Sequence, residues 1–139
     1  MHDHIDEIKP FKGMPEVLDA LHKQGHHLLV MSSNSEQNVR AFLRVNNLES
    51  YFDGVYGGAG ILSKAGALRK VIKSNRLEAD HCYYVGDEMR DVITASKVHV
   101  EAIAVTWGYQ ARDALAKYRP FALVDTPSQL LDLFSDNKE

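Results

Sequence analysis

The chain of 139 residues has little of what marks several classes of protein. Its single cysteine, Cys82, cannot form an intrachain disulfide, and its apolar neighbours predict a buried thiol in a reducing, cytoplasmic setting. No apolar run approaches membrane-spanning length, and residues 1–10 lack the apolar centre of a secretory signal. Basic residues are not in excess, since the net charge is -3. Nucleic acids and anionic membranes attract basic faces, so we expect neither as a partner.

What is present is the composition of a globular domain. Hydrophobic residues make up 45% and charged residues 25% of a chain long enough to bury a core. We expect residues 14–135 to form one α/β core, with a linker at 1–13 and a tail at 136–139. His2 and His4 then belong to a solvated tail rather than to a metal site.

Short apolar runs alternate with amphipathic segments along the chain. The predicted strands are 28–31, 52–56, 82–85, 102–106 and 122–124. The predicted helices begin at Pro15, at Asn34 or Ser35, at Lys64, near Met89, at Arg112 and at Pro127. Continuous apolar strands separated by helices are typical of a doubly wound parallel sheet with helices on both faces.

The stretch "CYYVGDEMRD", residues 82–91, organises the rest. An apolar strand ends at a glycine, and Asp87 and Glu88 follow at once. Asp91 lies four residues after Asp87, so a helix that begins here turns both carboxylates the same way. Acidic groups at the carboxyl end of a parallel strand repel one another, and a hard cation such as Mg²⁺ relieves that repulsion. The alternative is structural: Asp87 caps the helix, and its acidic neighbours favour the positive helix end.

Three further features follow strands or open helices at the same predicted edge of the sheet. Ser33 follows the first strand, Lys64 opens the third helix, and the segment 107–109 follows the fourth strand. A hydroxyl, an ammonium and a cation-binding carboxylate pair are what a phosphoryl group needs. The three features also have plainer interpretations: Ser33 as a helix cap, Lys64 as a solvated surface lysine, and Trp107 as a core residue or a loop plug. The glycines of 57–60 are interpreted as turn residues, since they lack the spacing of phosphate-binding motifs.

The order of these segments resembles a known family. "LLVMSSNS", a lysine opening a helix, "YYVGDEMRD" and "AVTWGY" are similar to the core of the haloacid dehalogenase superfamily, and within it to phosphoglycolate-phosphatase-like hydrolases. The resemblance implies a Rossmann-type α/β/α fold and Mg²⁺-dependent hydrolysis of a small phosphorylated metabolite. It implies phosphate binding by Ser33, Asn34 and Lys64, with Lys64 also catalytic. It assigns Asp87 to the metal, with Asp91 completing or supporting that ligand set.

The chain departs from this family at one point. The resemblance covers residues 9–133, and "IKPFKGMPE" resembles the segment that re-enters the core from the family's cap domain. The family begins with a strand ending in Asp-x-Asp-x-Thr, whose first aspartate is the nucleophile, and this sequence contains no such motif. Asp3 and Asp6 have no apolar strand before them and are spaced one residue too far apart. The resemblance therefore implies an incomplete or inactive copy, with no nucleophile assigned.

The absent strand also bears on assembly. In the resembled fold it lies between the strands that here end in Ser33 and Asp87, so its loss exposes two sheet edges or leaves a gap. Unpaired backbone groups in a buried strand cost about 1–3 kcal/mol each. We expect a homodimer to restore the pairing, with internal closure of the gap as the alternative.

Three functional hypotheses remain open at this point. The first is a phosphatase core that is incomplete or inactive. The second is a non-catalytic module that binds an anion or a partner at the retained site. The third, a phospho-receiver domain, is disfavoured because the order here is hydroxyl, lysine, acids, with no phosphoacceptor aspartate at a strand end between them.

Overall fold

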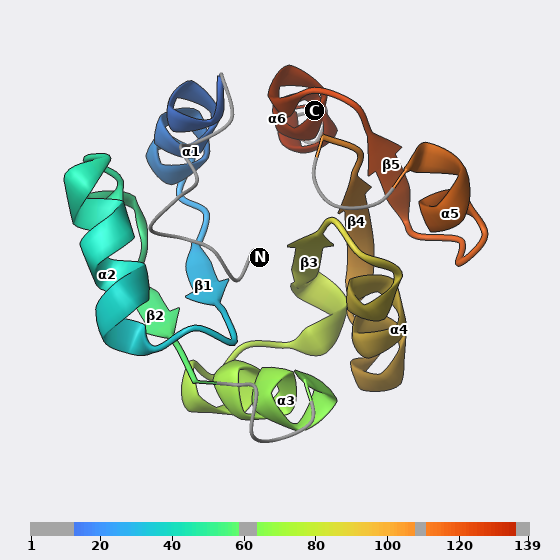
Figure 1. Ribbon diagram of the computed structural model, residues 1–139, viewed down its shortest axis with the longest axis horizontal. Helices are drawn as coiled ribbons and strands as arrows, with labels where there is room; N and C mark the ends of the chain where they lie inside the picture. Colours follow the sequence, from blue (N-terminus) through green and yellow to red (C-terminus); the bar gives the residue numbers. More distant parts are fainter. Residues whose placement is uncertain (1–12, 59–63, 108–110, 136–139) are drawn as a thin grey trace. The chain divides into compact units, whose positions relative to one another are not determined.

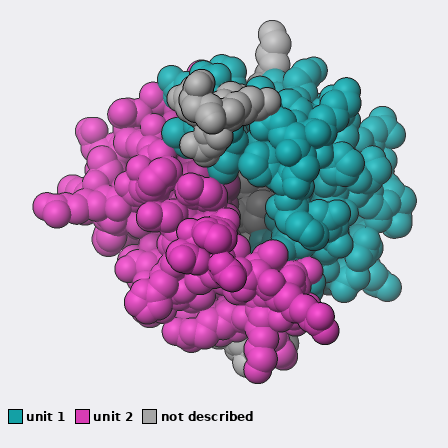
Figure 2. Space-filling view, turned by 180° about the vertical axis from the view of Figure 1, so that it is seen from behind, with its two compact units in different colours: residues 1–61, 127–139 teal, residues 62–126 magenta. Residues whose placement is uncertain are grey.

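The computed structural model describes residues 13–58, 64–107 and 111–135, which form two compact units (Figure 2). The first unit takes its described residues from 1–61 and 127–139, and the second from 62–126. The predictions for Asp3, Asp6, Gly60 and residues 108–109 lie outside the described residues. Among the helices that the structure describes, none is long and apolar enough to cross a membrane.

The first unit contains a two-stranded parallel sheet (Figure 1). Its elements are α1 (Met14–Lys23), β1 (Leu29–Met31), α2 (Glu36–Val45), η2 (Glu49–Tyr51), β2 (Gly54–Tyr56) and α6 (Pro127–Ser135). The ladder places Val30 opposite Val55. It begins one residue later than predicted, because the Leu28 backbone N–H donates to the Asp53 carboxylate at 3.3 Å instead of to a strand.

Apolar side chains from four of these elements fill the core of the first unit. Buried residues of this cluster are Leu18, Val30, Val39, Leu43, Leu48 and Val55. Val39 and Leu43 lie one helical turn apart on α2, so one face of that helix is buried while its polar face stays in water. The predicted spacing of apolar residues in this helix is confirmed, except that Phe42 is only half-buried.

The second unit is built on a three-stranded parallel sheet in the order β3-β4-β5. Its elements are α3 (Lys64–Ser74), η4 (Ala79–His81), β3 (Tyr83–Gly86), α4 (Met89–Val98), β4 (Glu101–Val105), α5 (Arg112–Ala116) and β5 (Ala122–Val124). The middle strand β4 is buried from Ala102 to Val105, as expected of a strand flanked by two others and covered by a helix. Helix α4 packs against β3 and β4, and α3 packs against α4 (Figure 1).

The predicted fold class is confirmed: the strands are parallel and alternate with helices. Among the described strands, β1 pairs only with β2 and β3 pairs only with β4.

The prediction of a fully buried strand at 82–85 is wrong. Cys82 precedes the strand and is half-buried, and Tyr83 is 39% exposed. The physical reason is that β3 has a described strand partner on one side only, so its first residues reach solvent. Burial, together with the charge of Asp80, still raises the pKa of the Cys82 thiol, which makes it a weak nucleophile.

Candidate functional site

Two aspartates are buried where β3 turns into α4. The strand ends at Gly86, Asp87 and Glu88 form the turn, and the helix begins at Met89. Asp87 is 3% exposed and Asp91 is 2% exposed, which is rare for acidic residues. A Cβ atom on Gly86 would overlap the Asp91 side chain, so only glycine lets that carboxylate approach the strand end so closely.

The Asp91 carboxylate accepts hydrogen bonds on both oxygens. Its Oδ2 accepts the backbone N–H groups of Asp87 and Glu88, each at 3.1 Å. Its Oδ1 lies 3.1 Å from the Lys64 ammonium and 3.4 Å from the Tyr84 hydroxyl. Since an ionised carboxylate has about four acceptor positions, Asp91 is close to saturated by the protein itself. It closes the first turn of α4 and organises the groups around it.

Lys64 is the cation of this site. It opens α3, as predicted, and its side chain is 24% exposed while Asp91 is almost wholly covered. An ammonium has three donor protons, and the contact with Asp91 takes one of them. Burial, followed by the negative charge of Asp91, raises the pKa of the Tyr84 hydroxyl. Tyr84 therefore stays protonated and donates toward Asp91.

Asp87 holds its carboxylate at the carboxyl end of the sheet. The Oδ1 atom is buried and receives no hydrogen bond from the described residues, although Asp87 does make other interactions. In their ionised forms, Asp87 and Asp91 together outweigh the single charge of Lys64. A hard oxygen donor with excess negative charge around it is the ligand type that Mg²⁺ prefers, so the residues present fit that ion.

The predicted phosphate-binding loop belongs to the first unit. Ser32 is buried and its Oγ accepts the Asn34 N–H at 3.1 Å, while Ser33 is exposed. The Asn34 side-chain oxygen accepts the Ser35 N–H and the Asn38 side-chain amide. Ser35 is the N-cap of α2, with its hydroxyl accepting the Asn38 N–H at 3.1 Å. Of the two predicted capping residues, the structure selects Ser35.

Glycines after β2 hold this loop in place. The Gly58 N–H donates to the Asn34 carbonyl at 2.6 Å, and Gly58 has the positive φ of a turn residue. Gly57 serves a different purpose, because a Cβ there would overlap the backbone of Asn34 to Glu36. The prediction of turn glycines thus holds for Gly58, whereas Gly57 is required by close packing of two loops.

The structure brings together three of the predicted site residues, Lys64, Asp87 and Asp91, within the second unit. Ser33 and Asn34 lie in the other unit, at the carboxyl end of β1. Sequence reasoning missed Tyr84 and the spacing of Glu88 and Asp91. That spacing is typical of a helix N-terminus and predicts the bond from the Glu88 N–H to Asp91.

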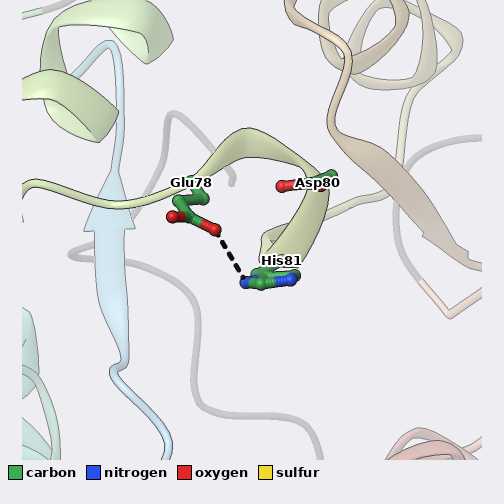
Figure 3. Close-up of side chains that lie close together, drawn as sticks. All are labelled: Glu78, Asp80 and His81. Carbon is green, nitrogen blue, oxygen red and sulfur yellow. Dashed lines mark ion pairs between the residues drawn. The ribbon is translucent and has the colours of Figure 1, made fainter.

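A second group of metal-ligating side chains lies elsewhere in the second unit. Ligand atoms of Glu78, Asp80 and His81, on or beside η4, all lie within 4.8 Å of one another (Figure 3). All three residues are exposed, and His81 Nδ1 is 3.2 Å from Glu78 Oε1. The group precedes β3, whereas Asp87 follows it, so the two groups mark opposite ends of one strand. Exposed acidic residues often cluster without binding a metal.

Comparison with known proteins decides the family. Residues 1–105 match the model of haloacid dehalogenase-like hydrolases. The chain belongs to this family. The match covers all the predicted site residues, from Ser33 and Asn34 in the first unit to Lys64, Asp87 and Asp91 in the second.

Relatives of this haloacid dehalogenase-like chain include phosphatases. It is 40% identical over 129 residues to the phosphoglycolate phosphatase of Synechococcus elongatus, covering 93% of this chain and 61% of that protein. It is 32% identical over 117 residues to a 5'-nucleotidase of Pseudomonas aeruginosa, covering 82% and 53% respectively. A crystal structure described as a predicted phosphatase from Clostridium acetobutylicum matches with a TM-score of 0.87 at 25% identity, covering 95% and 62%. The chain thus spans less than two thirds of each of these proteins.

Proposed function

We propose that this chain is the Mg²⁺- and phosphate-binding part of a phosphomonoester phosphatase. The observation that carries the proposal is the buried pair Asp87 and Asp91 at a strand end, with the Lys64 ammonium 3.1 Å from Asp91. Burying two carboxylates is costly unless cations compensate them, and one lysine balances only one of the two. The family match over residues 1–105 and the resemblance of "YYVGDEMRD" to an acidic motif of this family support the same assignment.

Each residue has a distinct role in this proposal. Asp87 holds the Mg²⁺ ion, and Asp91 holds Lys64 and the turn in position. When bound, the metal neutralises charge on a phosphoryl group. Lys64 offsets the remaining charge with its open donor protons, and Ser33 and Asn34 supply polar contacts to the phosphoryl oxygens. The substrate class is a small phosphomonoester, as for the phosphoglycolate phosphatase and 5'-nucleotidase that the chain resembles.

The 139 residues contain no Asp-x-Asp-x-Thr motif, which carries the carboxylate nucleophile in this family. We therefore propose that the chain alone binds but does not turn over an aryl phosphate. The measurement is phosphate release by purified chain with Mg²⁺. Turnover that co-purifies with the chain and disappears in Asp87→Asn would overturn this part of the proposal.

Metal binding is tested by following backbone NMR shifts during a Mg²⁺ titration. We expect Gly86 to Asp91 to shift first, and Asp87→Asn to abolish those shifts. The matched control is Asp80→Asn, an acidic residue of the exposed group beside η4, which should leave them unchanged. Shifts confined to Glu78–His81, or to the histidine-containing residues 2–4, would contradict the assignment.

A non-catalytic binding module is the second candidate, favoured by the absence of the nucleophile motif from the sequence. The two candidates differ in what restores activity. A separately made segment that carries an apolar strand ending in Asp-x-Asp should restore Mg²⁺-dependent phosphate release if the chain is part of a phosphatase. A binding module would bind inorganic phosphate equally well but stay inactive with that segment.

Assembly as a homodimer and a cytoplasmic location also remain proposals. The support for a dimer is that β1 and β3 each pair with one described strand only. Each therefore has an edge to which the strand of a second chain can add. Light scattering at micromolar concentration should give twice the chain mass of 15.6 kDa. A compact monomer with both strands protected from hydrogen exchange would contradict the dimer.

A further inference from the structure

A pocket lies at the opposite end of the β3-β4-β5 sheet from Asp87. Its volume is about 370 Å³, within the usual range for small-molecule sites of about 300–1,000 Å³. The lining comes from one face of α4 and the residues that follow it, the start of β4, and the segment between α5 and β5. All of these belong to the second unit. Because catalytic groups of parallel sheets gather at the carboxyl ends of strands, this pocket is separate from the candidate site.

The pocket combines an apolar floor, aromatic walls and charged groups. Val92, Val100 and Ala102 are buried beneath it. Tyr118 and Phe121 are 41% and 52% exposed, although large aromatic side chains are usually mostly buried. The ring of Phe121 packs against the ring of Tyr83 in a tilted arrangement, with centroids 5.4 Å apart. An exposed aromatic ring offers a flat surface on which a planar ligand can stack.

The charged side chains of the pocket are not engaged by the protein. Within the described ranges, no hydrogen bond or ion pair is formed by the side chains of His99, Glu101 or Arg119. A guanidinium binds phosphate or carboxylate oxygens through paired N–H donors. The Glu101 carboxylate, in turn, accepts hydrogen bonds from an amino group. The pocket therefore offers a guanidinium that binds an anion, from Arg119, and a carboxylate that accepts a hydrogen bond, from Glu101.

Two of these residues have backbone conformations that other residues adopt more easily. His99, the C-cap of α4, has φ +65°, and Arg119 has φ +52°. Glycine and asparagine adopt this left-handed region at lower cost, so folding alone does not favour arginine at position 119, whereas histidine tolerates it at the C-cap position 99. Unfavourable conformations that persist in a pocket support a hypothesis of function. Arg76 has φ +54° but does not line the pocket, so it serves as a matched control.

We propose that this pocket binds a small planar anion that also carries an amino donor, the chemistry of a nucleoside monophosphate. The flat base stacks on Phe121 and Tyr118, its amino group donates to Glu101, and the phosphate binds Arg119 with help from His99. This site goes beyond the proposed phosphatase function, since it takes no part in hydrolysis. Helix α4 connects it to Asp91, so an occupied pocket has a direct structural link to the candidate site.

The test uses adenosine 5'-monophosphate with the full chain, followed by backbone NMR in EDTA so that no Mg²⁺ is present. We expect saturable shifts at residues 99–102 and 119–121. Adenosine and ribose 5-phosphate, which each carry half of the chemistry, should bind at least about tenfold more weakly. No saturable shift at these residues up to millimolar ligand would overturn the proposal, as would shifts confined to residues 86–91. The second outcome leaves the proposed phosphate site standing.

Glycine substitutions separate a binding role from a structural one. His99→Gly and Arg119→Gly relieve the left-handed backbone and so should not lower the melting temperature, yet each should weaken binding at least about tenfold. Arg76→Gly relieves the same conformation outside the pocket and should leave binding unchanged. Equal loss of binding in all three variants, or full binding in both pocket variants, would contradict the assignment.

Discussion

The loops that follow β1 and β3 are both predicted site segments, the first for phosphate and the second for the metal, but they satisfy their polar groups in different ways. After β1, the chain places short hydroxyl and amide side chains that bond to nearby backbone, and Ser33 stays exposed. After β3, it buries two carboxylates, and a lysine from a different helix reaches one of them. The side chains of the first loop make local bonds, while the second loop depends on a side-chain contact between residues 27 positions apart.

This difference decides how strongly each loop indicates function. A serine and asparagine before a helix are sufficiently explained by capping, since Ser35 and Asn34 make those bonds here. Buried carboxylates are not explained by capping alone, because one acidic residue at the helix start satisfies the turn. Asp91 meets that need, so Asp87 is the residue whose burial calls for a further reason.

The largest effect on stability is expected when the same substitution, Asp to Asn, is made at each of the two buried aspartates. Asp91→Asn replaces one carboxylate oxygen by an amide nitrogen, which faces either Lys64 or both backbone donors, because the N–H groups of Asp87 and Glu88 donate to the same oxygen. We expect it to lower the free energy of unfolding by about 3 kcal/mol, the cost typical of breaking a buried ion pair. Asp87→Asn removes a buried negative charge instead, so it should leave stability unchanged or raise it. Urea unfolding of both variants without metal gives the measurement.

One outcome would contradict the assignment of Asp91 as the structural residue and Asp87 as the metal ligand. If Asp87→Asn is as destabilising as Asp91→Asn, Asp87 is structural and the Mg²⁺ assignment loses its support. A Lys64→Met variant serves as the third member of the set. It should reproduce part of the loss seen in Asp91→Asn and have little further effect in the double variant, since both remove one contact.

A smaller effect is expected from the glycines that let each loop pack closely. Gly57→Ala places a Cβ against the Asn34–Glu36 backbone, and Gly86→Ala places one against the Asp91 side chain. Both should cost about 1–3 kcal/mol as overpacking. Gly57→Ala should cost more, because backbone moves less readily than a side chain. Gly25→Ala is unsuited as a control because of its positive φ, so Gly66→Ala, inside α3, is the reference and should stabilise slightly.

Much of the fold could be predicted because its signals are local. Pro15 in the first turn of α1, Lys64 at the start of α3 and the strand at 122–124 all follow from short-range rules. The exposure of Tyr83 could not be predicted in this way. It depends on which strand lies beside β3, and an apolar aromatic run does not reveal whether it is an edge or a central strand.

The candidate site was predictable as a set of residue types but not as a set of contacts. The spacing of Asp87 and Asp91 indicates a shared direction, whereas the structure gives them unequal surroundings. The Tyr84 contact with Asp91 needs the strand and helix to be placed against each other, which no periodicity specifies. The pocket around Arg119 was missed for the same reason, since its lining comes from three separate segments.

The next prediction contrasts two serines of the first loop. Ser35→Ala removes the hydroxyl that caps α2, which should cost about 1 kcal/mol of stability, measured by urea unfolding. Ser33→Ala changes an exposed residue and should leave stability nearly unchanged, but it should weaken binding of inorganic phosphate. If Ser33→Ala leaves phosphate binding intact while lowering stability as much as Ser35→Ala, the first loop is only a helix cap.

The smallest effect concerns Asp125, an exposed carboxylate that contrasts with the buried Asp91. The Thr106 hydroxyl, 2.8 Å away, and the Arg112 guanidinium, 2.7 Å from both oxygens, lower the pKa of Asp125. A carboxyl group whose pKa is lower in the folded state stabilises the fold above the unfolded-state pKa of about 3.9 and loses this contribution as pH falls through the folded value. The stability difference between wild type and Asp125→Asn should therefore be constant at neutral pH and shrink below about pH 4. High salt should reduce this stability difference, because Asp125 and Arg112 lie at the surface.

The pKa of Asp125 is measured directly by NMR titration of its carboxyl carbon. Thr106→Val and Arg112→Ala should each raise that pKa. A pKa that neither variant changes would show that these contacts do not form in solution.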